Sequence, residues 1–231
     1  MASSSPLDHA AWESLHGGHA RFAQWHGQVV RYDPEVAPFL ALPPESDADV
    51  WRDVAEFAGP GGVVSVNLAA FSAPADWEIV EDIEGVQLVD DGVVPEPFPE
   101  AVRLGPADVP EIIDLVERTR PGPFRKRTIE LGTYLGVRDN GRLVALAGER
   151  MNPPGWREIS AVCTDPAYRG RGLATRLVLA VAAGIRERGE TPLMHALASN
   201  VNAIRLYESL GFRLRRRSRI VAVRVPHAAV A

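Results

Sequence analysis

A glycine-rich turn is the strongest chemical signal in this sequence. Residues 169–174 read Arg-Gly-Arg-Gly-Leu-Ala, between a short apolar strand candidate at 158–164 and a helical pattern at 173–188. A strand that leads through such a turn into a helix presents free backbone N–H groups and the positive end of the helix dipole to an anion. Glycine suits the turn, because a Cβ atom would block close approach of the ligand. The turn can therefore hold a pyrophosphate.

The spacing of this turn separates it from two common nucleotide sites. No Gly-Lys-Ser/Thr follows it, and the full Gly-x-Gly-x-x-Gly of a dinucleotide fingerprint is absent. It does match Arg/Gln-x-x-Gly-x-Gly/Ala, with Arg169, Gly172 and Ala174 in the fixed places. Residues 200–212 read Asn-Val-Asn-Ala-Ile-Arg-Leu-Tyr-Glu-Ser-Leu-Gly-Phe. Together the two segments resemble the paired motifs of the GNAT superfamily of acyl-CoA N-acyltransferases, in its FR47-like branch, over residues 101–225.

This resemblance implies an α/β (α+β) GNAT fold, with a mixed central sheet flanked by helices. It also implies acetyl-CoA as co-substrate: the turn would hold the pyrophosphate, and the edge of strand 162–164 would pair with the pantetheine amides as an added strand does. Asn200 would either cap its helix or bind the cofactor. The expected cofactor-binding residues are Val162, Cys163, Thr164, Arg169, Gly170, Arg171, Gly172, Leu173, Ala174, Thr175, Asn200 and Tyr207.

Two residues are the candidates for catalysis. The resemblance implies that the Tyr207 phenol protonates the departing thiolate, which its ordinary pKa of about 10 allows; packing of the ring in the core is the alternative. Glu158 stands where histone-type members carry a general-base glutamate, and an ordinary glutamate at a strand end is an equally good interpretation. Glu149 is the reserve base. The backbone amide near Val162 is expected to stabilise the oxyanion.

Other reactive side chains have simpler interpretations. Cys163 lies in an apolar run, which favours a small buried hydrophobe over a nucleophile. His16, His19 and His26 have no carboxylate partner that would complete a metal set, so no metal site is expected. His195 is expected to be a buried histidine with satisfied hydrogen bonds rather than a proton shuttle.

Composition indicates two parts. The chain has 231 residues, 46% hydrophobic and 24% charged. Alternate prolines at 95–99 favour an extended connector, so we expect a small acidic α/β domain at 1–97 and a GNAT domain at 98–231. Residues 1–100 hold three arginines and 18 acids, whereas 101–231 hold 22 basic and 12 acidic residues. The first part would be a degenerate or partial copy of the same fold.

The elements around the boundary can also be predicted. Segments 77–83 and 86–89 look like a pair of strands joined near Glu84-Gly85, and two closing strands are expected after Gly211. The acceptor is expected to meet a cleft formed by residues 119–131, the strands at 134–137 and 143–147, and the N-terminal part. Phe124, Arg127 and Trp156 are the predicted wall.

The remaining features limit the partners. Arg213, Arg215, Arg217 and Arg219 form a row on one strand face, with Arg216 opposite. The row would bind phosphate, protect an edge strand or pair with the acidic part; nucleic acid is not expected. No run approaches the ~18 apolar residues of a membrane span, and the single cysteine agrees with a reducing cytoplasm.

We therefore expect transfer of an acetyl group from acetyl-CoA to a primary amine, directly in a ternary complex, by a cytoplasmic monomer or homodimer. The alternative is a non-catalytic acyl-CoA-binding module whose N-terminal part contacts a partner. Residues 119–131 hold four basic residues and one acid, Glu130. This favours an acceptor that also carries a carboxylate.

Overall fold

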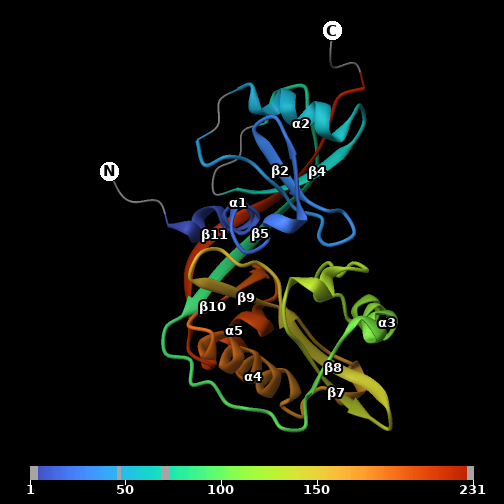
Figure 1. The fold of residues 1–231 in the computed structure, drawn as a ribbon, viewed down its shortest axis with the longest axis vertical. Helices are drawn as coiled ribbons and strands as arrows, with labels where there is room; N and C mark the ends of the chain where they lie inside the picture. The colour runs from blue at the N-terminus through green and yellow to red at the C-terminus, as the bar shows by residue number, and fades with distance from the viewer. Residues whose placement is uncertain (1–4, 46–47, 69–72, 228–231) are drawn as a thin grey trace.

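The computed structural model describes residues 5–45, 48–68 and 73–227. At its centre lies an eight-stranded sheet with the order β4, β11, β5, β10, β9, β8, β7, β6 (Figure 1). Strands β9 and β10 pair in parallel, and the other neighbours in this sheet pair antiparallel. The mixed α/β fold is thus confirmed. The strands are β4 (Val63–Leu68), β5 (Glu78–Asp90), β6 (Val102–Arg103), β7 (Tyr134–Asp139), β8 (Arg142–Glu149), β9 (Trp156–Thr164), β10 (Thr191–Leu197) and β11 (Phe212–Arg224).

Helices cover both faces of this sheet. The helices are α3 (Val109–Thr119), α4 (Leu173–Glu187) and α5 (Val201–Ser209). Leu177, Val181 and Ile185 of α4 recur at every fourth position and are buried. They share a core cluster with Ala145, whereas Leu146 belongs to the cluster beneath α3. Because neighbouring strand residues point to opposite faces, α3 and α4 lie on opposite sides of β8.

The first part of the chain forms a smaller layer next to this sheet (blue and cyan in Figure 1). Its elements are α1 (Ala10–His16), β1 (Ala23–His26), β2 (Val29–Tyr32), β3 (Leu40–Ala41) and α2 (Val50–Ala58), with β1, β2 and β3 in an antiparallel sheet. Single 3₁₀ turns are η1 (Pro6–His9), η2 (Ala20–Phe22), η3 (Pro106–Asp108), η4 (Thr128–Leu131) and η5 (Pro166–Tyr168). None of the helices within the described ranges has the length and hydropathy to cross a membrane.

The pair of strands expected at 77–89 is wrong, because this segment is the single strand β5. Both edges of β5 are paired: Gly85 lies opposite Ser218 of β11 and Leu197 of β10. A Cβ atom on Gly85 would come 3.1 Å from the Ser218 hydroxyl oxygen, so this glycine serves close strand packing rather than a turn. Within residues 212–227, which the structure describes, β11 is the only strand, and β5 takes the place of the second closing strand that we expected.

The sheet contains strands from both sides of the boundary that the sequence indicates. Strands β4 and β5 precede residue 97, yet they pair with β11. In Figure 1, β5 and β11 run together from the lower layer into the upper one. Residues 91–101 connect β5 to β6 without regular structure, and Val93 and Phe98 anchor this connector in the core. The division into 1–97 and 98–231 therefore stays a prediction.

The arginine row of β11 pairs with acids from the first hundred residues. A bulge between Leu214 and Arg216 brings Arg215 and Arg216 to the same carboxylate, Asp8, at 2.7 and 2.8 Å, so Arg216 does not point away as expected. The other ion pairs are Arg213 with Asp91, Arg217 with Glu84, and Arg219 with Asp82. Of the three interpretations offered by the sequence, the structure supports pairing with the acidic part.

Candidate functional site

The glycine-rich turn leaves β9 and enters α4. Asp165 anchors its start by accepting a hydrogen bond from the Ala167 amide and by pairing with Arg118 and Arg142. Gly170 and Gly172 have φ angles of +75° and +73°, which favour glycine. Nothing lies within 4 Å of a Cβ built on either residue, so both face open space.

The start of α4 is suited to an anion. Gly172 is its N-cap and makes no side-chain cap, and the first turn contains Leu173, Ala174 and Thr175. The N–H groups of a first turn have no acceptor within their own helix. Arg169 and Arg171 are exposed beside the turn, where they donate weakly to the carbonyl groups of Thr164 and Ala167. The turn therefore presents amide donors and positive charge to solvent.

Strands β9 and β10 diverge next to this turn. Their parallel pairing ends at Ile159 and Met194, although β9 continues to Thr164 and β10 to Leu197. Backbone groups on the facing edges beyond that point are thus available to a ligand that lies between the strands.

A bulge changes the direction of β9 within this gap. Cys163 pairs with Leu146 and Ser160 with Gly148, so Ala161 and Val162 together face Ala147. Ala161 adopts φ +55°, an uncommon angle for a residue with a Cβ atom. Such a bulge re-aims the following amide, which belongs to Val162.

Residues of the second motif lie on α5. The Asn200 side chain accepts a hydrogen bond from the Ala203 amide at 3.2 Å, which is the capping role. Tyr207 is buried, and burial raises its pKa to about 12. Its ring packs against Phe212, and no hydrogen bond of its hydroxyl is found among the described residues. Tyr207 thus keeps its proton over the physiological pH range.

Cys163 and Thr164 end β9. Cys163 is buried, and burial raises the pKa of its thiol to about 11, so the thiol is protonated near neutral pH. The Thr164 hydroxyl oxygen is buried, and no partner for it is found within the described part of the chain. This environment suits the interpretation of Cys163 as a small hydrophobe.

Glu158 lies at the centre of a buried ionic cluster. Its carboxylate accepts two hydrogen bonds from Arg150, at 2.6 and 2.8 Å, one from the Met151 amide, and one from Nδ1 of His195 at 2.9 Å. Burial alone would raise the pKa of Glu158, but Arg150 and His195 outweigh it and hold this pKa well below its ordinary range. A carboxylate so paired is a weak proton acceptor, and its oxygens are already occupied.

Glu149, the reserve base, is also buried and paired. Arg188 lies 2.7 Å from its carboxylate and Arg157 lies 3.7 Å from it. Neither glutamate therefore offers a free carboxylate to an incoming amine.

Breaking the Arg150 pair should destabilise the fold. Arg150→Met leaves the buried Glu158 carboxylate with His195 and the Met151 amide but without its guanidinium partner, and we expect a loss of about 3 kcal/mol in unfolding free energy, measured by urea denaturation. The double variant Arg150→Met, Glu158→Gln removes the uncompensated charge and should recover part of that loss. A double variant less stable than Arg150→Met would contradict this account of the cluster.

His195 connects this cluster to a second side chain, Gln87. The Gln87 amide is fixed, because its oxygen accepts from Arg215 and its nitrogen donates to the Leu7 carbonyl, each at 2.8 Å. Its other N–H points to Nε2 of His195 at 3.0 Å. Nε2 must therefore carry a lone pair, and Nδ1 carries the proton that is donated to Glu158. His195 is thus hydrogen-bonded on both nitrogens, as the sequence indicated.

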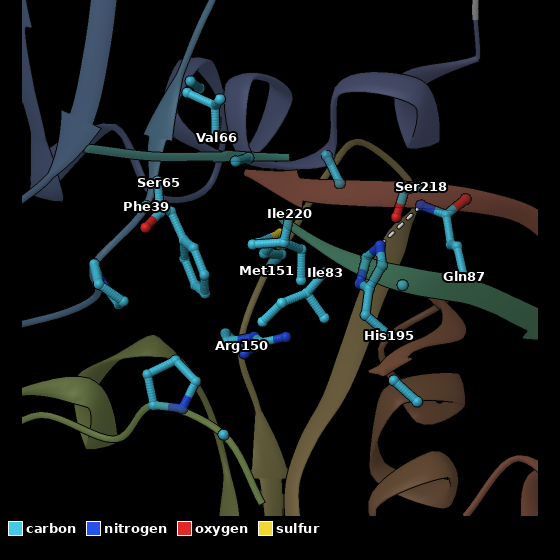
Figure 2. A pocket seen from close by; sticks show the side chains of 18 of the residues that line it. Phe39, Ser65, Val66, Ile83, Gln87, Arg150, Met151, His195, Ser218 and Ile220 are labelled. Carbon is cyan, nitrogen blue, oxygen red and sulfur yellow. Dashed lines mark hydrogen bonds between the residues drawn. The ribbon is translucent and has the colours of Figure 1, made fainter. Parts of the chain in front are cut away.

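His195 also lines a cavity of about 370 Å³ between the first part of the chain and the large sheet (Figure 2). Gln87, Arg150, Met151 and Ser218 contribute to its wall. Of the predicted acceptor segment, residues 120–123 line the cavity. The predicted wall residues Phe124, Arg127 and Trp156 do not line it. Phe124 packs on Tyr134, and Arg127 pairs with Asp33 and Glu130. Trp156 contacts the cluster around Leu193.

Comparison with known proteins adds independent information. The model of a family described as FR47-like protein matches residues 134–221. A crystal structure of a putative acetyltransferase from the GNAT family of Novosphingobium aromaticivorans is 40% identical, with a TM-score of 0.87, over 95% of this chain and 98% of that one. A GCN5-related N-acetyltransferase from Kribbella flavida has a TM-score of 0.63 at 18% identity, over 94% and 95% of the two chains, and shows the same fold.

Curated relatives match shorter stretches. A mycothiol acetyltransferase of Thermomonospora curvata is 39% identical over 82 residues, which are 35% of this chain and 27% of that protein. The N-alpha-acetyltransferase RimI of Mycobacterium tuberculosis is 38% identical over 95 residues, 36% of this chain and 56% of that protein. The chain thus spans well under two thirds of the curated relatives that it matches.

Proposed function

The chain belongs to the GNAT family, and from this premise we propose that it is an N-acetyltransferase, which transfers an acetyl group from acetyl-CoA to a primary amine without a covalent enzyme intermediate. One observation carries the proposal. Strands β9 and β10 separate after Ile159 and Met194. The glycine-rich turn, which follows β9, lies at the open end of this gap, and His195, next to Met194, lies at its closed end. This arrangement suits a thioester held between the strands and an amine that reaches it from the cavity.

The residues present fit coenzyme A. Amide groups of residues 170–175 and the Thr175 hydroxyl would bind the pyrophosphate, with Arg169 and Arg171 beside them. The free edge of Val162, Cys163 and Thr164 offers backbone groups to the pantetheine amides. Asn200 caps α5 and contributes by fixing that helix. The open space above the two glycines is consistent with a phosphate there.

Acetyl transfer forms a C–N bond and breaks the C–S bond. The amine nitrogen attacks the thioester carbonyl carbon, and the Val162 amide donates to the oxygen that becomes negative. As the tetrahedral intermediate collapses, the thiolate leaves and takes the Tyr207 phenolic proton. Cys163 takes no part.

The proton from the amine needs an acceptor, for which His195 is suited better than Glu158. Nε2 of His195 holds a lone pair on the cavity side, where an amine would displace the Gln87 N–H. The buried Glu158 carboxylate then stabilises the protonated ring through Nδ1. Glu158, which the sequence suggested as the base, becomes a positioning residue in this mechanism.

Tyr207→Phe should reduce kcat about 100-fold and leave the affinity for acetyl-CoA unchanged, because it removes only the proton donor. The pKa of about 12 also predicts a pH effect. The phenol can donate a proton only below its pKa, so ionisation of Tyr207 should not lower kcat at any pH below about 11. A Tyr207→Phe variant with wild-type kcat would remove Tyr207 from the mechanism.

The function itself is tested by chromatographic measurement of free CoA when the protein is mixed with acetyl-CoA and a panel of primary amines. We expect release of CoA and acetylated amine in equal amounts. Binding of acetyl-CoA without release by any amine would instead support the acyl-CoA-binding module.

A further inference from the structure

The cavity beside His195 has a defined floor and walls (Figure 2). Its floor is one face of the paired strands β5 and β11, where Gln87, Ile83, Ser218 and Ile220 lie. The small residues Gly85 and Ser218 face one another there and leave room above them. The volume of about 370 Å³ is that of a pocket for a small molecule.

Apolar side chains dominate the walls. Phe39, Leu40 and Val66 come from the first part of the chain, and Met151 comes from the loop after β8. The two parts of the chain thus enclose the cavity jointly. An occupant must have an apolar body to replace water on these surfaces.

The charged groups of the cavity are mostly neutralised. Arg150 pairs with Glu158, and Arg216 pairs with Asp8. For the Arg120 guanidinium, no ion pair or hydrogen bond is found in the described part of the chain, although Arg120 lines the cavity. Glu81 is also unpaired among these residues, and it lies six positions along β5 from Gln87, about 20 Å from the His195 end. Among the described residues, Arg120 is therefore a cation without a partner that lines the cavity, while the unpaired carboxylate of Glu81 lies far from His195.

These observations distinguish classes of amine. A polyamine would place its second ammonium group against a wall whose nearer carboxylates are already paired with arginines. An amine that also carries a carboxylate would pair with Arg120. For acetyl transfer, its amine must also reach the lone pair on Nε2 of His195.

We propose that this cavity binds the acceptor, and that the acceptor is an apolar α-amino acid whose carboxylate pairs with Arg120. The proposal rests on the proposed acetyltransferase function. Both parts of the chain then contribute to specificity: Phe39 and Val66 contact the side chain of the acceptor, and Arg120 distinguishes acids from their amides.

The test compares L-leucine with L-leucinamide and spermidine as acceptors, in wild type and in Arg120→Asn. Asparagine tolerates the φ of +50° at this position, so the variant should fold. We expect wild type to favour leucine, and the ratio of kcat/KM for leucine over leucinamide to fall roughly tenfold in Arg120→Asn. Arg125→Asn, in the same loop but outside the cavity wall, is the matched control and should keep the ratio.

Preference for leucinamide or spermidine in wild type, or an unchanged ratio in Arg120→Asn, would overturn the assignment. Failure of every amine to release CoA would be a failure of the proposed function instead. Calorimetric binding of leucine in the presence of CoA then tests the cavity alone. Leucine binding that is lost in Ser218→Phe, which fills the floor, supports the assignment; binding that persists there refutes it.

Discussion

Gly172→Glu is expected to weaken the binding of acetyl-CoA by about 100-fold or more. A residue with a Cβ atom at φ +73° carries a strain of about 1–3 kcal/mol, and the new carboxylate would lie at the helix end that should receive the pyrophosphate. Repulsion between the two anions adds to the strain. Isothermal calorimetry of acetyl-CoA binding measures the effect.

Gly189→Glu is a matched control at the other end of the same helix. Gly189 has φ +76°, and nothing lies within 4 Å of a Cβ built on it, so the strain and the free space are the same. It should bind acetyl-CoA like wild type. Equal losses in the two variants would show that strain, and not the anion site, explains the result.

His195→Gln is expected to lower kcat about 1000-fold with little change in acetyl-CoA affinity, because the variant loses the group that takes the amine proton. Glutamine can still donate to Glu158, so the buried cluster stays paired. Steady-state kinetics with a saturating amine measure the effect.

His9→Gln provides the control, since His9 lines the same cavity but has no role in the mechanism. Its kcat should match that of wild type. Glu158→Gln should act through His195, with a smaller loss of kcat and no change in acetyl-CoA affinity. If His195→Gln kept full kcat, the proton acceptor would have to be another group.

Local sequence predicted the strand, glycine-rich turn and helix of residues 158–188 well, because this geometry depends on a few neighbouring residues. Gly170 and Gly172 take left-handed conformations that their own types allow, and the apolar repeat from Leu177 to Ile185 is enough to specify α4. Asn200 caps its helix through a residue only three positions away.

The position of β5 could not be predicted in this way. Gly85 suggested a turn, but its neighbours Ser218 and Leu197 come from strands more than 100 residues later. Strand pairing over such distances leaves little trace in a local pattern.

The surroundings of the candidate site residues depend on long-range pairing in the same way. The types of Glu158 and His195 are visible in the sequence, but their protonation depends on Arg150 and Gln87, which only the fold brings to them. Arg120 carried no signal beyond its charge, since its place on the cavity wall, with no partner among the described residues, depends on the assembled fold. Leu193 and His195 are two positions apart in β10, so the sequence could have shown that their side chains share a face of the sheet. It could not have shown which residues they contact there.

The most direct test of this account is a crystal structure of the protein with coenzyme A. We predict that the pyrophosphate contacts the amides of residues 170–175 and that the pantetheine lies between β9 and β10. The thiol should then be close to the Tyr207 hydroxyl, at the end of the gap that His195 borders. Coenzyme A bound outside this gap, or with its thiol directed away from the cavity, would contradict the account.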